Sequence, residues 1–210
     1  MKEYTSFKYI YPPRPSIVAP MNALPTYERM GFIAQPKLNG SYGVLFLQAG
    51  FVKMMGRHNN TFARNTLKDS DLTTLYRGPG FMVLIGEYMN KSQKDSKGKP
   101  FNGFVVFDIL VYNNKHLVNS TFAERQEILD TLYPVYHDND QFTVSLGNNM
   151  YRAKNFNEGF NELWKEAVKV QMYEGFVLKR PSGILENGIR ESNNTGWQLK
   201  IRKETKNYKY

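Results

Sequence analysis

Charged side chains interrupt several stretches of this 210-residue sequence that are otherwise apolar. Glu87 lies within VLIGEYM and Asp108 within VVFDILV, while Glu174 opens and Lys179 closes the run EGFVLK. Lys37 stands between the apolar runs FIA and VLF. Any one of these charges fits a structural ion pair or a solvated face, because buried charges in proteins are usually paired. Charges of both signs on several apolar runs instead indicate a shared polar site.

That mixture of charges suits phosphoryl chemistry. Lysine and arginine neutralise phosphate oxygens, and carboxylates hold the divalent cation that bridges them. Lys200 and Arg202 are two residues apart, so in a strand both side chains point to one face. A lysine becomes a nucleophile when partial burial or nearby cations lower its pKa. Lys37, between apolar runs in a lysine-rich site, is placed for that role.

Composition narrows the choice of chemistry and of partner. The chain has no cysteine and three dispersed histidines, His58, His116 and His137. Disulfides, thiolate zinc sites and cysteine nucleophiles are therefore excluded, and we expect any metal to be a hard cation such as Mg²⁺ or Mn²⁺ on oxygen ligands. The formal net charge of +9 favours a polyanionic partner. The sequence has no long apolar run and no apolar signal segment, which predicts a cytoplasmic protein, neither secreted nor in a membrane.

Strands, more than helices, must position these side chains. Runs rich in β-branched and aromatic residues predict strands over 32–38, 42–48, 51–55, 81–89, 101–113, 174–180 and 196–203. Helical spacing predicts helices over 120–133, with a capping box from Thr121 to Glu124, and over 157–170, with Trp164 in the core. The pattern indicates a single α+β domain with a mainly antiparallel core.

Two segments have no such periodicity. Residues 1–30 are rich in proline and tyrosine and predict an irregular N-terminal segment packed on the domain that spans 31–210. Residues 91–100, KSQKDSKGKP, predict a polar loop that is either solvated or in contact with DNA.

Six short motifs occur in order along most of the chain. They are KLNG at 37–40, GRHN at 56–59, GEY at 86–88, FD at 107–108, EGFVLK at 174–179 and KIR at 200–202. In this order they resemble the motifs of the nucleotidyltransferase (adenylation) domain of ATP-dependent DNA ligases. These belong to a superfamily of covalent nucleotidyltransferases that also contains RNA ligases and mRNA capping enzymes. The resemblance implies an ATP-grasp-like fold of mainly antiparallel sheets with flanking helices.

The resemblance also implies roles for particular residues. Lys37 would attack ATP and carry AMP as a covalent lysyl-AMP, for transfer to the 5′-phosphate of nicked duplex DNA. Phe107 would stack on the adenine, and Glu87 would bind the ribose and assist metal binding. Glu174 would bind the metal, while Asp108 is expected to bond locally rather than to a metal.

The remaining matched residues would bind phosphate. Lys179, Lys200 and Arg202 would contact the α-phosphate of the nucleotide. Arg57 would contact phosphates of the nucleotide or the nucleic acid, and His58 beside it would contact DNA or serve the turn. We expect the protein to act as a monomer.

Three departures from the family pattern bear on the substrate. Asn39 replaces the usual aspartate of the first motif, and Tyr42 stands where DNA ligases usually carry an arginine. The sequence ends soon after the last motif, so the oligonucleotide-binding (OB) fold domain that normally follows is expected to be absent, or supplied by a separate domain or subunit.

The segments FDILVYNNKHLVNSTFAERQEIL and NGIRESNNTGWQLKIRK favour a DNA ligase over its relatives, because both resemble DNA-ligase stretches. An RNA ligase, an mRNA capping guanylyltransferase and a non-catalytic nucleic-acid-binding relative stay open as alternatives.

Overall fold

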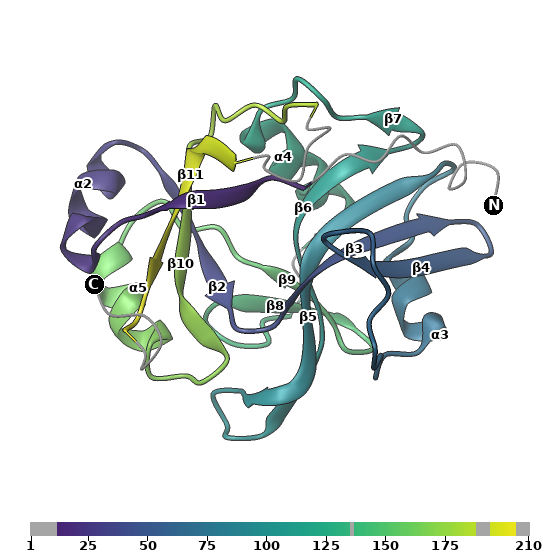
Figure 1. Ribbon diagram of the computed structural model, residues 1–210, viewed down its shortest axis with the longest axis horizontal. Helices are drawn as coiled ribbons and strands as arrows, with labels where there is room; N and C mark the ends of the chain where they lie inside the picture. The colour runs from purple at the N-terminus through teal and green to yellow at the C-terminus, as the bar shows by residue number, and fades with distance from the viewer. Residues whose placement is uncertain (1–11, 135–136, 188–193, 205–210) are drawn as a thin grey trace.

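Two β-sheets lie side by side in the computed structural model, which describes residues 12–134, 137–187 and 194–204 (Figure 1). The smaller sheet has four strands in the order β1-β11-β10-β2. Their bounds are Arg14–Val18, Asn194–Arg202, Tyr173–Lys179 and Ile33–Leu38. Strand β10 pairs antiparallel with both of its neighbours, whereas β1 runs parallel to β11 at the edge.

The larger sheet has seven strands, six of them in the order β4-β3-β5-β6-β9-β8, with β7 added beside β6. Their bounds, in that order and with β7 last, are Phe51–Gly56, Ser41–Gln48, Met82–Lys94, Pro100–Tyr112, Met150–Ala153, Thr143–Gly147 and Lys115–His116. Among the described residues of this sheet, only β6 and β9 run parallel. The mainly antiparallel α+β fold predicted from the sequence is therefore confirmed.

Short helices flank the sheets. They are η1 (Met21–Ala23), α2 (Leu24–Arg29), α3 (Asp69–Leu72), η2 (Thr73–Leu75), α4 (Phe122–Leu132) and α5 (Phe160–Ala167). The predicted capping box at the start of α4 is present, with Thr121 and Glu124 bonded reciprocally. Helix α5 is shorter than predicted because the chain enters it through Gly159 at φ 74°, and Glu28 of α2 accepts hydrogen bonds from the backbone N–H groups of Gly159 and Phe160.

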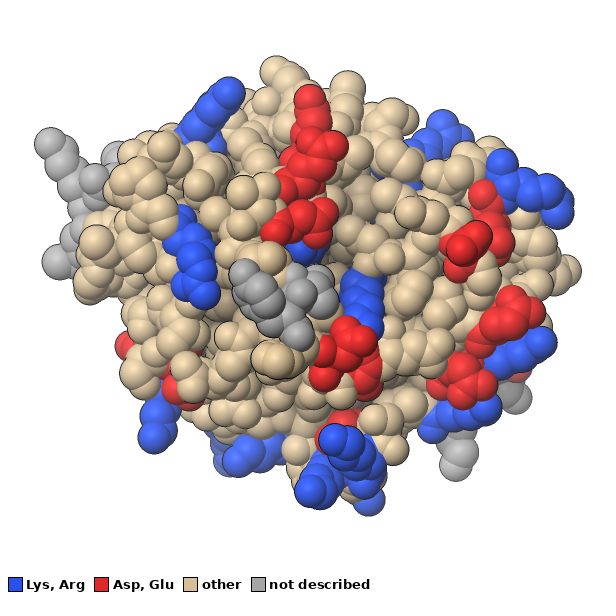
Figure 2. Space-filling model, turned by 180° about the vertical axis from the view of Figure 1, so that it is seen from behind, with Lys and Arg blue, Asp and Glu red and all other residues tan. Residues whose placement is uncertain are grey.

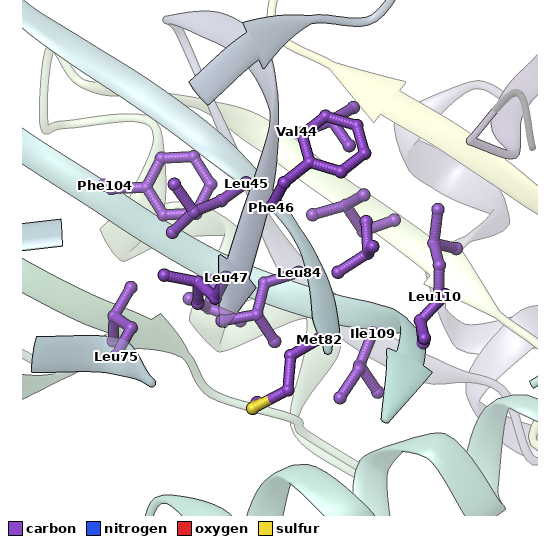
Figure 3. Packing of buried hydrophobic residues seen from close by; sticks show 14 of the residues in the cluster. Val44, Leu45, Phe46, Leu47, Leu75, Met82, Leu84, Phe104, Ile109 and Leu110 are labelled. Carbon is purple, nitrogen blue, oxygen red and sulfur yellow. The ribbon is translucent and has the colours of Figure 1, made fainter. Parts of the chain in front are cut away.

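Two clusters of buried hydrophobic residues form the core of the fold. The larger is centred on β3, where the consecutive residues 44–47 are all buried, and it continues into β5 and β6 (Figure 3). Burial on both faces explains why this strand is apolar throughout rather than alternating. The second cluster packs the smaller sheet against α2 and α5 and includes Trp164, as predicted.

The structure differs from the sequence expectation at two segments. Within the predicted irregular segment 1–30, residues 12–30 contain β1 and α2, while residues 1–11 lie outside the described residues. The predicted polar loop 91–100 is instead a β-hairpin, because β5 continues to Lys94 and β6 begins at Pro100. Among the described residues, no helix is both long and apolar enough to cross a membrane.

Candidate functional site

The two sheets meet around a cavity of about 310 Å³. Strands β2, β10 and β11 line it from the smaller sheet, and β3, β5 and β6 line it from the larger one. Six of the predicted nucleotide and metal ligands lie in its wall: Lys37, Glu87, Phe107, Lys179, Lys200 and Arg202, together with Tyr42 and Asp108, which the sequence also singled out. Residues far apart in the chain are therefore gathered at one place.

Lys37 forms an ion pair with Glu174 beside the cavity. Lys37 Nζ lies 2.5 Å from Glu174 Oε2, and Arg202 Nη1 lies 3.9 Å from the same oxygen. The pairing of strands explains the arrangement, since Gly175 of β10 stands opposite Lys37 of β2 on one side and Arg202 of β11 on the other. One carboxylate thus faces two cations that come from different strands.

Glu87 reaches the same region from β5 of the other sheet. The backbone N–H of Gly40 donates a hydrogen bond to Glu87 Oε1 at 3.2 Å. Burial raises the pKa of Glu87 to about 7, although the nearby Lys37 and the Gly40 hydrogen bond both act to lower it. A carboxylate so placed would gain from a neighbouring cation.

Gly40 is required where the chain crosses between the sheets. A Cβ at this position would lie 2.6 Å from both the backbone oxygen of Tyr88 and the sulfur of Met89. Asn39, beside it, donates its backbone N–H to the carbonyl of Met172 at 2.9 Å. The glycine of the first motif therefore serves close packing of β2 and β3 against β5.

Lys179 is a buried residue of the cavity wall. Its Nζ donates to Gln35 Oε1 at 2.6 Å and sits over the rings of Phe107 and Phe122, at 5.1 and 4.6 Å from their centroids. Burial lowers the pKa of Lys179 to about 8, and the nearby Asp108 opposes that shift. The side chain is held as a partly desolvated cation that a phosphate could bind.

Aromatic and polar neighbours fix the ring of Phe107. Tyr42 packs edge-on against it, with ring centroids 5.4 Å apart and planes at 76°. The Tyr42 hydroxyl donates to the carbonyl of Pro13 at 3.3 Å, and Gln35 Nε2 donates to the carbonyl of Phe107 at 3.2 Å. The cavity wall therefore includes a positioned aromatic ring that could stack on a base.

Asp108 does not face the cavity as a free carboxylate. It accepts two hydrogen bonds from Arg125, from Nε at 2.8 Å and from Nη2 at 3.0 Å, and both side chains are almost fully buried. The prediction that it bonds locally agrees with this contact. In the described part of the chain, no three His, Cys, Asp or Glu side chains gather as a metal cluster.

Arg57 and His58 are not among the residues that line the cavity. Arg57 is buried, and its Nη2 and Nε donate to the carbonyl of Pro12 at 3.2 and 3.4 Å, so it anchors the N-terminal segment. His58 is exposed in the loop after β4. Their predicted contacts with phosphate therefore stay predictions.

Sequence reasoning missed two residues of the wall. Arg14 lines the cavity from β1, and its charge, with those of Arg202 and Lys37, adds to burial in lowering the pKa of Lys200. Gln35 lies two residues before Lys37 and bonds to Lys179. Neither belongs to a matched motif. The proximity of Gln35 to Lys37 on a predicted strand, with both side chains on one face, was the only available signal.

Comparison with known proteins assigns the chain to a family. The family model described as the ATP dependent DNA ligase domain matches residues 81–200, which is more than half of the chain. The chain belongs to this family. The match begins after the first two motifs and includes the GEY, FD and EGFVLK motifs.

Curated DNA ligases are similar in sequence. The chain is 30% identical over 112 residues to a DNA ligase of Methanococcus aeolicus, a match that covers 52% of this chain and 18% of the relative. It is 30% identical over 139 residues to DNA ligase 3 of Dictyostelium discoideum, which covers 59% of this chain and 11% of the relative. The chain thus spans less than a fifth of either relative.

Solved structures share the fold of this ligase domain. Mycobacterial DNA ligase D complexed with ATP and MES matches with a TM-score of 0.64 at 16% identity, over 93% of this chain and 62% of that one. The ATP-dependent DNA ligase from bacteriophage T7 in complex with ATP matches with a TM-score of 0.50 at 16% identity, over 88% of this chain and 68% of that one. The fold is that of a ligase nucleotidyltransferase domain.

Proposed function

We propose that this chain is the adenylation domain of an ATP-dependent DNA ligase and that Lys37 is the residue that receives AMP. The observation that carries the proposal is the 2.5 Å contact between Lys37 Nζ and Glu174 Oε2, beside a cavity that Lys179, Lys200 and Arg202 line. A lysine that attacks phosphorus must lose a proton, and an adjacent carboxylate can accept it. The other cations stand where phosphate would bring negative charge.

The first step exchanges one bond for another at the α-phosphorus of ATP. Lys37 Nζ forms a bond to that phosphorus, the bond to the bridging oxygen of pyrophosphate breaks, and pyrophosphate leaves with the electron pair. Nζ is an ammonium in its ion pair and loses two protons in the step: the first passes to Glu174, within hydrogen-bond distance, and frees the lone pair, and the second leaves to solvent or pyrophosphate as the N–P bond forms. The product is a lysyl-AMP phosphoramidate, and the surrounding cations stabilise the charge that gathers on the α-phosphate.

The later steps use this stored AMP. The 5′-phosphate of a nicked DNA duplex attacks the phosphoramidate and takes the AMP from Lys37. A 3′-hydroxyl then attacks that activated 5′-phosphate, so that a phosphodiester forms and AMP leaves. The family of ATP-dependent DNA ligases supports these steps. We propose that an OB-fold domain or subunit completes the site for them, because the chain spans only part of the ligases that it resembles.

Two carboxylates fit a hard divalent cation at this site. Glu87 would hold Mg²⁺ or Mn²⁺, and Glu174 would join it as the ionised carboxylate once the proton from Lys37 has passed on to solvent, with phosphate oxygens and water as further ligands. The raised pKa of Glu87 supports this, because a buried carboxylate with too little positive charge around it is stabilised by a cation. When bound, the cation would supply charge neutralisation to the triphosphate.

Labelling with ATP radioactive at the α-phosphate tests the proposal. In the presence of Mg²⁺, the wild-type chain is expected to retain the label after denaturation, and Lys37→Ala is expected to lose it. Lys165→Ala, which removes an exposed lysine of α5, is the matched control and should label like the wild type. A labelled Lys37→Ala protein, or an unlabelled wild type, would contradict the assignment.

The same assay separates the alternatives. Labelling by GTP in preference to ATP would indicate a capping guanylyltransferase. Sealing of a nicked RNA strand in preference to nicked DNA, with any OB-fold partner supplied, would indicate an RNA ligase. DNA binding without any labelling would indicate a non-catalytic relative.

A further inference from the structure

Strands β5 and β6 extend beyond the body of the larger sheet as a hairpin, which we call the basic hairpin (residues 91–99). It contains Lys91, Lys94, Lys97 and Lys99 against the single acid Asp95, a net charge of +3 in nine residues. All four lysines are exposed, and none forms an ion pair with any residue that the structure describes. A stretch this basic, with no internal neutralisation, attracts polyanions.

The tip of the basic hairpin is held in one conformation. Asp95 Oδ1 accepts hydrogen bonds from the backbone N–H groups of Lys97 and Lys99, at 2.9 and 2.8 Å. Gly98 takes φ 74° and donates its N–H to the carbonyl of Asp95 at 3.0 Å. The one acidic side chain is therefore occupied in shaping the turn. The tip lysines are attached to an ordered backbone, which reduces the entropy lost when they bind.

The basic hairpin is anchored at Lys94, beside its turn, to the segment that leads into the smaller sheet. The N–H of Lys94 donates to the side chain of Gln171, and the N–H of Met172 donates to the carbonyl of Lys94, both at 3.1 Å. Gln171 and Met172 lead directly into β10. The hairpin is thus fixed relative to the strand that carries Glu174.

A β-bulge turns the hairpin at its base. Asn90 pairs with Asn102 and Lys94 with Pro100, so β5 has two more residues than β6 between these pairs. Lys91 lies in the bulge at φ 68°, a left-handed conformation that lysine adopts rarely. Bulges bend a strand and re-aim its side chains. The unfavourable backbone conformation of the exposed Lys91 is explained if the bulge is needed to point the basic hairpin toward its binding partner.

The distance from the cavity decides which anion the hairpin can meet. Glu87 lines the cavity from the same strand, and a strand rises about 3.3 Å per residue, so Lys91 and Lys94 lie up to about 13 and 23 Å along β5 from it. None of the four lysines of the basic hairpin lines the cavity, so a nucleotide bound there would not lie among them. A duplex strand has a phosphate about every 3.4 Å, so phosphates up to about the seventh from its end would lie within that reach.

Figure 2 agrees with this placement. Lys and Arg side chains project together at the lower edge of the face that it shows, where Figure 1 has the tip of the β5–β6 hairpin. We propose that the basic hairpin binds backbone phosphates of the DNA duplex, several nucleotides from the end that lies at Lys37. The proposal rests on the proposed function for the position of that end.

The experiment removes the four lysines and measures DNA binding. The hairpin variant is Lys91→Asn, Lys94→Gln, Lys97→Gln and Lys99→Gln, with asparagine at 91 because it tolerates the left-handed conformation. A matched control replaces four exposed lysines elsewhere by glutamine: Lys68, Lys115, Lys165 and Lys169. Both variants lose the same charge, and thermal unfolding checks that both stay folded.

Fluorescence anisotropy with a nicked duplex, at several salt concentrations, reports the affinity. Each lysine that binds a phosphate contributes about 0.9 to the slope of log K against log salt. We expect the slope of the hairpin variant to fall by about 2 to 3.5 and its affinity to fall at least tenfold, with a less than threefold change in the control. Equal losses in the two variants would overturn the proposal.

Duplex length gives a second test. Shortening the arm that reaches the hairpin to fewer than about four base pairs should remove the difference between wild type and hairpin variant, whereas shortening the other arm should preserve it. If the difference in affinity between wild type and hairpin variant does not depend on the length of either arm, the proposed position of the hairpin on the duplex is refuted. Lysyl-AMP formation from labelled ATP should be the same in the hairpin variant and the wild type. Loss of labelling in the wild type contradicts the proposed function, whereas an unchanged salt slope contradicts only this inference.

Discussion

The ionised side chain of Glu87 lowers the stability of the fold, whereas the proposed adenylation reaction needs it. Burial raises its pKa from 4.5 to about 7, so the folded chain holds this proton to a higher pH than the unfolded chain does. The stabilising contribution of the protonated side chain is complete below pH 4.5 and is lost as the pH rises through 7. Above that pH, the ionised carboxylate lowers the free energy of unfolding by up to about 3 kcal/mol, at 1.36 kcal/mol per pKa unit.

We therefore expect Glu87→Gln to stabilise the fold in alkaline solution while impairing adenylation. The free energy of unfolding should rise by about 1–3 kcal/mol at pH 8 and change little at pH 4.5. Urea unfolding at the two pH values measures both quantities, and α-labelled ATP measures the loss of lysyl-AMP. The same stability change at both pH values would show that the ionisation of Glu87 is not responsible.

Helix α4 and strand β6 are joined by a buried ion pair whose two members depend on each other. Arg125 is fully buried and bonds to both oxygens of Asp108, while its guanidinium carbon also lies 5.6 Å from the centroid of the Trp197 ring. Removing one partner leaves a buried charge without compensation. The pair also lies close behind Lys179, whose pKa responds to both charges.

Arg125→Met is expected to lower the free energy of unfolding by about 3–5 kcal/mol, because the Asp108 carboxylate would stay buried and unpaired. The double variant Asp108→Asn, Arg125→Met should recover part of that loss, since no isolated charge is left. Chemical unfolding of the two single variants and the double variant forms a complete cycle. Additive losses would contradict the coupling of the pair.

At the scale of elements, the sequence predicts the strands that build the cavity better than those at the edges. The runs 32–38, 42–48 and 81–89 are long and apolar because both sheets bury them, and each begins or ends near its predicted limit. Strands β8 and β9 are short and partly polar, and were not predicted. Strand β1 contains a proline and pairs in parallel with β11, about 180 residues away, which no local pattern shows.

The residues of the candidate site also differ in how well the sequence predicts their positions. Lys37 and Glu174 lie together because β2 and β10 pair. The motif match predicts that the two residues share a site, but it does not reveal this pairing of strands. Arg57 matched a motif, but its guanidinium is bonded to the backbone of Pro12. Arg14 reaches the cavity through the position of β1. The roles of these residues in adenylation stay predictions.

The whole molecule should respond to ATP as one cooperative unit, because both sheets contribute to one cavity. A ligand at 100 times its dissociation constant stabilises the folded state by about 2.7 kcal/mol. For a chain of this length that corresponds to a rise in Tm of about 5–10 °C. If AMP becomes covalently attached, the rise should survive gel filtration in the wild type and disappear in Lys37→Ala.

Differential scanning fluorimetry before and after gel filtration measures the Tm of the wild type and of Lys37→Ala. Incubation with pyrophosphate, which reverses the first step, should return the filtered wild type to its original Tm. A shift that disappears on filtration of the wild type would indicate reversible binding alone.

The crossing at Asn39 and Gly40 limits how far the two sheets can move apart near Lys37. Only these two residues separate β2 in one sheet from β3 in the other, so the facing ends of the two strands lie three residue steps apart and at most about 11 Å from each other. The sheets are also tied by two hydrogen bonds, from Gln35 Nε2 to the carbonyl of Phe107 and from Met172 N–H to the carbonyl of Lys94. With the crossing and these two ties around it, Lys37 is expected to keep its place relative to the larger sheet when a bulky molecule enters the cavity.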